Sequence, residues 1–257
     1  MNAGSMYEIR RQRGSLRTSW LDARFSFSFG PYDDPDWRDF GPLAALNEDV
    51  VQPGTGFAMH PHRDLDIFMI PRHGAIAHED SLGNRLQLAP GEVLMMRSGS
   101  GIRHSQMNPS ATQLDHHFQL WLEPPAAGLA PAIELRRFDD ARPGQWVPLA
   151  SEHGSAGAFR LAQPARICIG AASAGEALAL HLAPGTSAYL HVMEGRCTAD
   201  IDGRREHLAG GEALVAYELR EAATLRGAGA DARFLLVLVP SSRVLRNRTR
   251  AETRAGK

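Results

Sequence analysis

Short runs of apolar residues, many of them alternating with polar ones, follow one another along the chain. In the first half these runs lie at 65–70, 75–80, 85–89, 92–96 and 116–122, and turn sequences such as SLGN and PG separate them. Alternation at every second residue is typical of a strand with one buried face, and glycine and proline mark the turns between strands. Long helical stripes are scarce. The pattern predicts an all-β chain built as a sandwich or barrel.

The second half of the chain repeats the first. The sequence GAIAHEDSLGNRLQLAPGEVL (74–94) aligns with GRCTADIDGRREHLAGGEAL (195–214), with one residue fewer in the turn. A repeat of about 120 residues is too long for a solenoid unit, so it predicts two tandem barrels. The Pro-rich segment 124–132 places the boundary between them. We expect an N-terminal barrel at 1–125, a C-terminal barrel at 133–240 and a basic, solvated tail at 241–257.

Composition narrows the class of function. The 257 residues include 28 Lys and Arg against 29 Asp and Glu, a formal net charge of -1, so no overall field would recruit nucleic acid or an anionic membrane. No apolar run approaches the roughly 18 residues that span a bilayer, and the Arg-rich start lacks the apolar segment of a secretory signal. We therefore expect a cytoplasmic protein, and a monomer. Cys168 and Cys197 are predicted to be buried thiols rather than a disulfide framework.

Histidines crowd the first half, where seven of the 11 lie between 60 and 117. His60 and His62 are two residues apart before a strand, and such residues share one face of an extended chain. His104 and Gln106 repeat this spacing on a second extended segment. Three imidazoles and an amide oxygen suit Fe(II), Mn, Ni, Cu or Zn better than Mg or Ca, which prefer all-oxygen ligands. We interpret these four residues as metal ligands.

Asp66 would continue the face of His60 and His62 if the strand ran on regularly, which makes it a candidate ligand or base. The remaining histidines of the crowded segment are interpreted as surface or hydrogen-bonded strand residues. They are His73, His78, His116 and His117.

The repeat provides an internal control for the metal site. The alignment pairs His60 with His181, His62 with Ala183, Asp66 with Ser187, His104 with Thr224, and Gln106 with Arg226. The second copy keeps the strand pattern without the ligand set, so the ligands are not a by-product of that pattern. One barrel is therefore predicted to bind metal and the other to be structural.

Two motifs resemble those of cupins: GTGFAMHPH with Asp66 downstream, and GSGIRHSQMN. Together with SWLDARFSFSFGPYDDPDWRDFGPL, HEDSLGN and FQLWLEPP, they identify the chain as similar to the pirins, a bicupin family that includes bacterial quercetinases. The resemblance covers most of residues 1–140, and the second half resembles the family's degenerate C-terminal cupin. It implies a bicupin fold and one metal, usually iron, at His60, His62, His104 and position 106. It also implies dioxygenase chemistry on a flavonol with O2.

This sequence departs from the family pattern at two site positions. Gln106 replaces a Glu that the family usually has, and Asp66 stands where the first motif usually has Glu. An amide oxygen is a weaker, uncharged donor, so metal would bind less tightly. Gln106 cannot accept a proton, which leaves Asp66 as the substitute base, unless a metal-bound flavonol ionises without help.

Two further functions compete with the dioxygenase. One is a non-catalytic regulatory module that contacts a protein partner, which the weakened ligand at Gln106 favours. The other is a structural bicupin with an empty pocket. The basic tail is too short and uneven to indicate nucleic-acid binding. Among aromatic residues, Phe57 beside the histidine pair is the preferred candidate for lining a substrate pocket, and Arg63 and Arg103 are expected to point away from the ligands.

Overall fold

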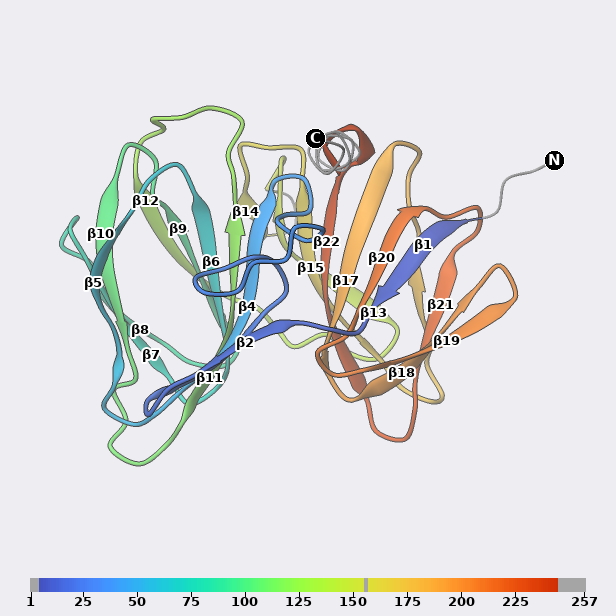
Figure 1. Ribbon diagram of the computed structural model, residues 1–257, viewed down its shortest axis with the longest axis horizontal. Helices are drawn as coiled ribbons and strands as arrows, with labels where there is room; N and C mark the ends of the chain where they lie inside the picture. The colour runs from blue at the N-terminus through green and yellow to red at the C-terminus, as the bar shows by residue number, and fades with distance from the viewer. Residues whose placement is uncertain (1–4, 155–156, 245–257) are drawn as a thin grey trace. The chain divides into compact units, whose positions relative to one another are not determined.

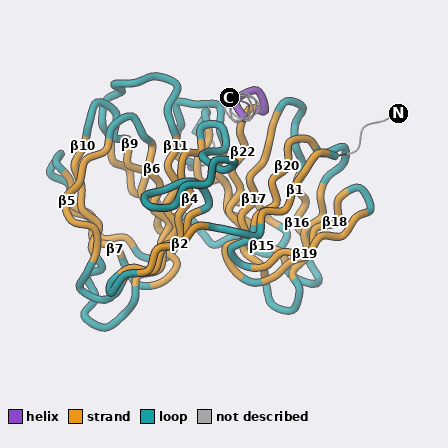
Figure 2. Tube along the Cα trace, in the orientation of Figure 1, coloured by secondary structure: helices purple, strands orange, loops and turns teal. Residues whose placement is uncertain are grey.

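The computed structural model describes residues 5–154 and 157–244, and strands make up most of it (Figure 1). Strand and loop account for almost the whole trace, with a short helical turn at 241–244 near the C-terminal end (Figure 2). The chain forms two compact units. One unit is Arg13–Phe138, and the other combines Asp139–Lys257 with Met1–Gln12. The prediction of an all-β chain with two β-sheet domains is confirmed.

The N-terminal unit consists of two antiparallel sheets. The larger sheet has the order β12 (Ala132–Arg137), β9 (Glu92–Arg97), β6 (Asp66–His73), β11 (Asp115–Leu122), β4 (Leu43–Val51), β3 (Leu21–Phe25) and β2 (Gly14–Arg17). The smaller sheet has the order β5 (Gly56–His62), β10 (Ile102–Met107), β7 (Ile76–Asp80) and β8 (Arg85–Leu88). Ile67 and Met69, two residues apart on β6, bury their side chains in one cluster with Ile76 and Leu88 of the smaller sheet. The apolar alternation in the sequence thus faces the space between the two sheets.

The C-terminal unit has the same two-sheet plan. Its larger sheet has the order β1 (Met6–Arg10), β20 (Ala213–Glu218), β17 (Thr186–Glu194), β22 (Ala232–Pro240), β15 (Arg166–Ala172), β13 (Gln145–Ser151) and β14 (Phe159–Arg160). Its smaller sheet has the order β16 (Leu178–Leu180), β21 (Ala223–Gly227), β18 (Arg196–Ile201) and β19 (Arg204–Ala209). The order β5-β10-β7-β8 of the first unit matches β16-β21-β18-β19 of the second, which confirms the internal repeat.

Strand register corrects one part of the predicted alignment. Gln106 on β10 lies opposite His78 on β7, and Leu225 on β21 lies opposite Ala199 on β18. Because His78 aligns with Ala199, the counterpart of Gln106 is Leu225 and not Arg226. The second copy is two residues shorter between these positions, and the predicted alignment allowed for only the one lost in the turn, so it slips by one. Leu225 and Ala199 both belong to the apolar core of the C-terminal unit. The second unit thus has apolar side chains at the positions of the polar residues Gln106 and His78.

The unit boundaries differ from the expected 1–125 and 133–240. β12 follows the Pro-rich segment yet pairs with β9 in the N-terminal unit, and β1 begins the chain yet pairs with β20 in the C-terminal unit. Each larger sheet therefore has an edge strand, β12 or β1, that lies outside the sequence segment predicted for its unit. No local sequence pattern indicates with which sheet such a strand pairs.

Both cysteines are buried free thiols, as predicted. Burial raises the pKa of Cys168 to about 11 and that of Cys197 to about 12, so both stay protonated. Most of the predicted basic tail, residues 245–257, lies outside the described residues. Within the ranges that are described, no helix is both long and apolar enough to cross a membrane.

Candidate metal centre

Two neighbouring strands of the smaller N-terminal sheet carry the predicted ligands. In the antiparallel pair of β5 and β10, His104 lies opposite His60, and the register shifts between His104 and Gln106. Gly56 allows the close approach at this bulge, because its φ is 155° and a Cβ there would lie 2.2 Å from the carbonyl oxygen of Gln106. The sequence therefore folds so that residues from two separate motifs share one site.

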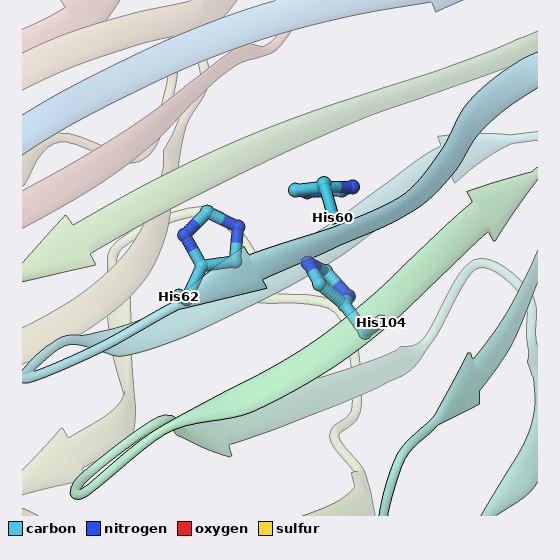
Figure 3. A group of neighbouring side chains, drawn as sticks. All are labelled: His60, His62 and His104. Carbon is cyan, nitrogen blue, oxygen red and sulfur yellow. The ribbon is translucent and has the colours of Figure 1, made fainter.

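The three predicted imidazoles converge. His60 and His62 project from β5 toward His104 on β10 (Figure 3), and one ring nitrogen from each lies within 4.8 Å of the others. The ring centroids are 4.5 Å apart for His60 and His104, 4.8 Å for His60 and His62, and 5.0 Å for His62 and His104. Three neutral nitrogen donors at this spacing are the donor set that a divalent transition metal takes.

Burial favours the neutral form of two of these imidazoles. Desolvation, followed by the charges of the neighbouring histidines, lowers the pKa of His104 to about 2, and desolvation with His60 lowers that of His62 to about 4. Nε2 of His104 is fully buried and has no hydrogen-bond partner among the described residues. A buried nitrogen lone pair without a donor is costly in a folded protein unless a ligand uses it, so the site fits a bound divalent metal.

Supporting hydrogen bonds select the tautomers that present Nε2. Nδ1 of His60 lies 2.7 Å from the carbonyl oxygen of Ala58, which can only accept, so Nδ1 carries the proton. Nδ1 of His104 lies 3.4 Å from Nδ1 of His78, whose Nε2 lies 2.9 Å from the Asp80 carboxylate. Asp80 accepts from His78, so the Nδ1 of His78 accepts from His104 and leaves the Nε2 of His104 free to bind metal.

Asp80 is held as a carboxylate. Although burial desolvates it, hydrogen bonds from His78, Asn84 and Leu82 together lower the pKa of the Asp80 carboxyl below its usual value. Sequence analysis missed both His78 and Asp80 as parts of the site. The available signal was that His78 is the fourth histidine of the crowded segment, and its contact with His104 depends on how β7 pairs with β10.

The fourth predicted ligand, Gln106, is buried on the same strand as His104, and the burial alternation of β10 gives both the inward face. Its Oε1 accepts a hydrogen bond of 2.7 Å from Nε2 of Gln119, and Oε1 of Gln119 accepts one of 2.7 Å from the indole of Trp121. The structure thus places Gln106 beside His104 but with its oxygen engaged by β11. Its role as a metal ligand stays a prediction.

Asp66 does not continue the strand of His60 and His62. The chain turns at Asp64, which has a φ of 54° and donates its N–H to the carbonyl of Gly99, and Asp66 begins β6 in the other sheet. There it is fully buried, 2.9 Å from Nε of Arg97. The expectation of one regular extended segment failed because of this left-handed turn, and a catalytic role for Asp66 stays a prediction.

Comparisons with known proteins place the chain in a family. The Pirin profile matches residues 6–122, and the profile of the quercetinase C-terminal cupin domain matches residues 148–237. A quercetin 2,3-dioxygenase of Escherichia coli O157:H7 is 34% identical over 203 residues, which are 79% of this chain and 86% of that protein. The chain belongs to the pirin family. A pirin-like protein of Caulobacter vibrioides is 37% identical to this pirin over 196 residues, 75% of this chain and 82% of that protein.

A solved structure agrees with this assignment. The bacterial pirin YhhW from Escherichia coli in complex with nickel(II) is 31% identical and matches with a TM-score of 0.83, covering 91% of this chain and 99% of that one. The sequence resemblance is therefore confirmed, and so is the bicupin fold that it implied.

Aromatic side chains of the pirin surround two of the histidines. The ring centroids are 6.4 Å apart for Phe57 and His60, and 4.9 Å apart for Trp121 and His62. His62 also lines an open surface pocket together with Arg63 and Arg103. Arg103 is exposed between the buried residues Ile102 and His104 of β10, so it faces away from His104, as expected.

Replacing Asp80 with asparagine should weaken metal binding by roughly 10–100-fold, the usual effect of losing a group that orients a ligand. The backbone N–H groups of Leu82 and Asn84 point at Oδ1 of Asp80, so the asparagine oxygen would stay there and its NH2 would face His78. The histidine pair would then reverse its tautomers and protonate Nε2 of His104. Competition with a chelator for Co(II) measures the effect, and Asp200→Asn on the C-terminal unit is the control. Unchanged Co(II) affinity in Asp80→Asn would contradict the proposed orientation.

His73, His116 and His117 are hydrogen-bonded strand residues, as predicted. His117 is buried with Asp115, 3.0 Å from its Nδ1, and Asp49, 3.6 Å from its Nε2. Burial raises the pKa of Asp49 to about 6 against the opposing effect of His117. Burial lowers the pKa of His117, but Asp115 and Asp49 outweigh it and the net shift is upward.

This buried cluster should make the pirin less stable as pH rises. The folded state holds the proton of Asp49 up to about pH 6, whereas the carboxyl of the unfolded chain ionises near its ordinary pKa of 3.8. The protonated carboxyl therefore contributes its full stabilisation below pH 3.8, and this contribution is lost as the pH rises from 3.8 to about 6. Relative to Asp49→Asn, the wild type should lose roughly 1–3 kcal/mol of unfolding free energy between pH 4 and pH 7. Urea unfolding followed by tryptophan fluorescence measures this difference.

Glu48 and His116, the other charged neighbours of Asp49, remain in both proteins and cancel in the comparison. Asp33→Asn, which changes a largely exposed aspartate, is the control and should follow the wild type. A difference between wild type and Asp49→Asn that is the same at every pH would rule out the buried carboxyl as its source.

Proposed function

We propose that this pirin is a mononuclear metal-dependent dioxygenase that opens a flavonol of the quercetin type with O2. The convergence of His60, His62 and His104 carries the proposal, because it offers three imidazole nitrogen donors at metal-binding spacing. The name of the Escherichia coli relative supports the reaction, and the nickel(II) complex of the Escherichia coli pirin supports a divalent metal. We propose Fe(II) as the metal, with Mn, Ni, Cu and Zn as the alternatives to be tested.

The three histidines would hold the ion, which when bound supplies a Lewis acid for the flavonol oxygens and a redox partner for O2. Ala58 and His78 fix the rings of His60 and His104 so that Nε2 faces the centre. Phe57 and Trp121, packed against His60 and His62, would place apolar rings where an aromatic substrate has to enter.

Proton removal from the substrate needs a base, and neither predicted candidate is well suited to this step. The amide of Gln106 cannot accept a proton, and Asp66 of β6 is paired with Arg97 of β9. The flavonol is therefore proposed to bind as its 3-oxyanion. Arg63 and Arg103, which follow His62 and precede His104 along the chain, would attract such an anion to this part of the unit through their positive charge.

Elemental analysis of the purified protein, followed by aerobic incubation of Fe(II)-, Mn-, Ni- and Cu-loaded samples with quercetin, tests the proposal. Loss of the flavonol absorption band that requires both metal and O2 would support it, and His60→Ala provides the metal-free control. Stoichiometric metal without turnover in any loaded form would reject the dioxygenase. Such a result would favour a non-catalytic pirin that binds a protein partner.

A further inference from the structure

A hydrogen-bond chain of fixed polarity runs from Trp121 to Gln106. The indole Nε1–H of Trp121 can only donate, so the oxygen of Gln119 must face it, at 2.7 Å. The NH2 of Gln119 is then directed at Gln106, and the oxygen of Gln106 accepts this bond at 2.7 Å. One donor-only group at the start of the chain thus determines the orientation of both amides.

The free end of this chain is an amide NH2 in the interior of the metal-binding unit. Nε2 of Gln106 is fully buried and has no hydrogen-bond partner among residues 5–154 and 157–244. Gln106 itself is 3% exposed and follows His104 by two residues on the inward face of β10. An unpartnered buried donor destabilises a protein unless a ligand accepts its hydrogen, and the nearest ligand site on this face is that of His104.

We propose that Gln106 is a hydrogen-bond donor to an anionic ligand held at the metal, rather than a metal ligand itself. Gln119 and Trp121 are positioning residues that aim its NH2 at that anion. The inference rests on the proposed function, because it requires a metal at His60, His62 and His104.

The charge balance of the site defines the class of ligand. Three neutral imidazoles leave the full double charge of a divalent ion uncompensated, and Gln106 adds a donor instead of a negative charge. The centre therefore selects small anions and the oxyanions of enols and phenols over the corresponding neutral molecules. A flavonol 3-oxyanion belongs to this class.

Azide binding to the Co(II)-loaded full-length protein tests the inference without turnover. Azide is a small anion that can coordinate the metal and accept a hydrogen bond, and visible absorption of Co(II) reports its binding. In Gln106→Met, which keeps the side-chain length but loses the donor, azide should bind roughly tenfold more weakly, the usual size of a hydrogen bond to a charged group. Its Co(II) affinity, measured by chelator competition, should stay within threefold of the wild type.

Trp121→Phe tests the positioning residues. It keeps a ring against His62 but removes the indole donor, so both amides can turn over and the oxygen of Gln106 can face the centre. Azide affinity should fall several-fold while Co(II) affinity is kept or improved. Trp146→Phe is the matched control, since this indole donates to the carbonyl of Ala179 in the C-terminal unit. It should change neither affinity.

A tenfold loss of Co(II) affinity in Gln106→Met, with azide affinity unchanged, would overturn the inference and make Gln106 a ligand through its oxygen. Unchanged azide affinity in Trp121→Phe would overturn the positioning role. If azide affinity falls as expected in both variants and no metal form turns over quercetin, the inference stands and the proposed dioxygenase fails.

Discussion

Replacing His60 or His104 with alanine should abolish metal binding while the protein stays folded. Each substitution removes one of the three nitrogen donors, so the loss should exceed the roughly 10–100-fold effect of removing a supporting residue. The fold should persist because the second unit has the same strand order with apolar residues in its interior. Elemental analysis and Co(II) titration measure the first effect, and circular dichroism measures the second.

The two variants should differ in stability. His104 is fully buried and shares a hydrogen bond with His78, whereas His60 is partly exposed and bonds to a backbone carbonyl. His104→Ala should therefore melt at a lower temperature than His60→Ala. His181→Ala is the control, because it removes an exposed histidine from the C-terminal unit. Full metal occupancy in either site variant would refute the metal centre.

Replacing Gln106 with glutamate should tighten Co(II) binding by roughly tenfold or more. One carboxylate oxygen can keep the hydrogen bond that the NH2 of Gln119 donates now, and the second oxygen then brings a negative charge toward the histidines. Azide should bind more weakly to this variant, because the donor is lost and the new charge repels it. Flavonol turnover should rise, since a carboxylate at this position can also take the substrate proton.

Gln113→Glu controls for the added charge, since it places the same change on an exposed residue of the same unit. It should leave Co(II) and azide affinity unchanged. If Gln106→Glu also leaves both unchanged, the side chain at 106 faces away from the metal, and both its predicted ligand role and its donor role are wrong.

Sequence patterns were sufficient for the fold and for the three histidines. Alternating apolar runs predicted the sheets, the repeat predicted two units of one plan, and the spacing of His60, His62 and His104 predicted their convergence. The shared face of His60 and His62 follows from the two-residue period of a strand. The approach of His104 on a second strand was expected from the resemblance to the two cupin motifs.

The contacts that side chains make across neighbouring strands could not be predicted from the sequence. Whether His78 meets His104, and whether Gln119 meets Gln106, is decided by the register of β10 with β7 and by side-chain contact with β11. Asp66 was expected on the histidine face because the sequence RDLD (63–66) does not indicate that Asp64 adopts a left-handed backbone conformation. Short polar residues tolerate that conformation, but only the packed structure shows which of them adopts it.

The placement of β1 has a consequence for synthesis on the ribosome. This strand emerges before the whole N-terminal unit. Its partner β20 is made only after more than two hundred further residues, by which time the N-terminal unit including β12 has emerged. An unpaired strand edge is a template for pairing with other chains. Met6–Arg10 therefore has to stay unpaired while the N-terminal unit folds. Glu8 and Arg10 alternate with apolar residues along this strand, and their charges oppose its aggregation with other chains.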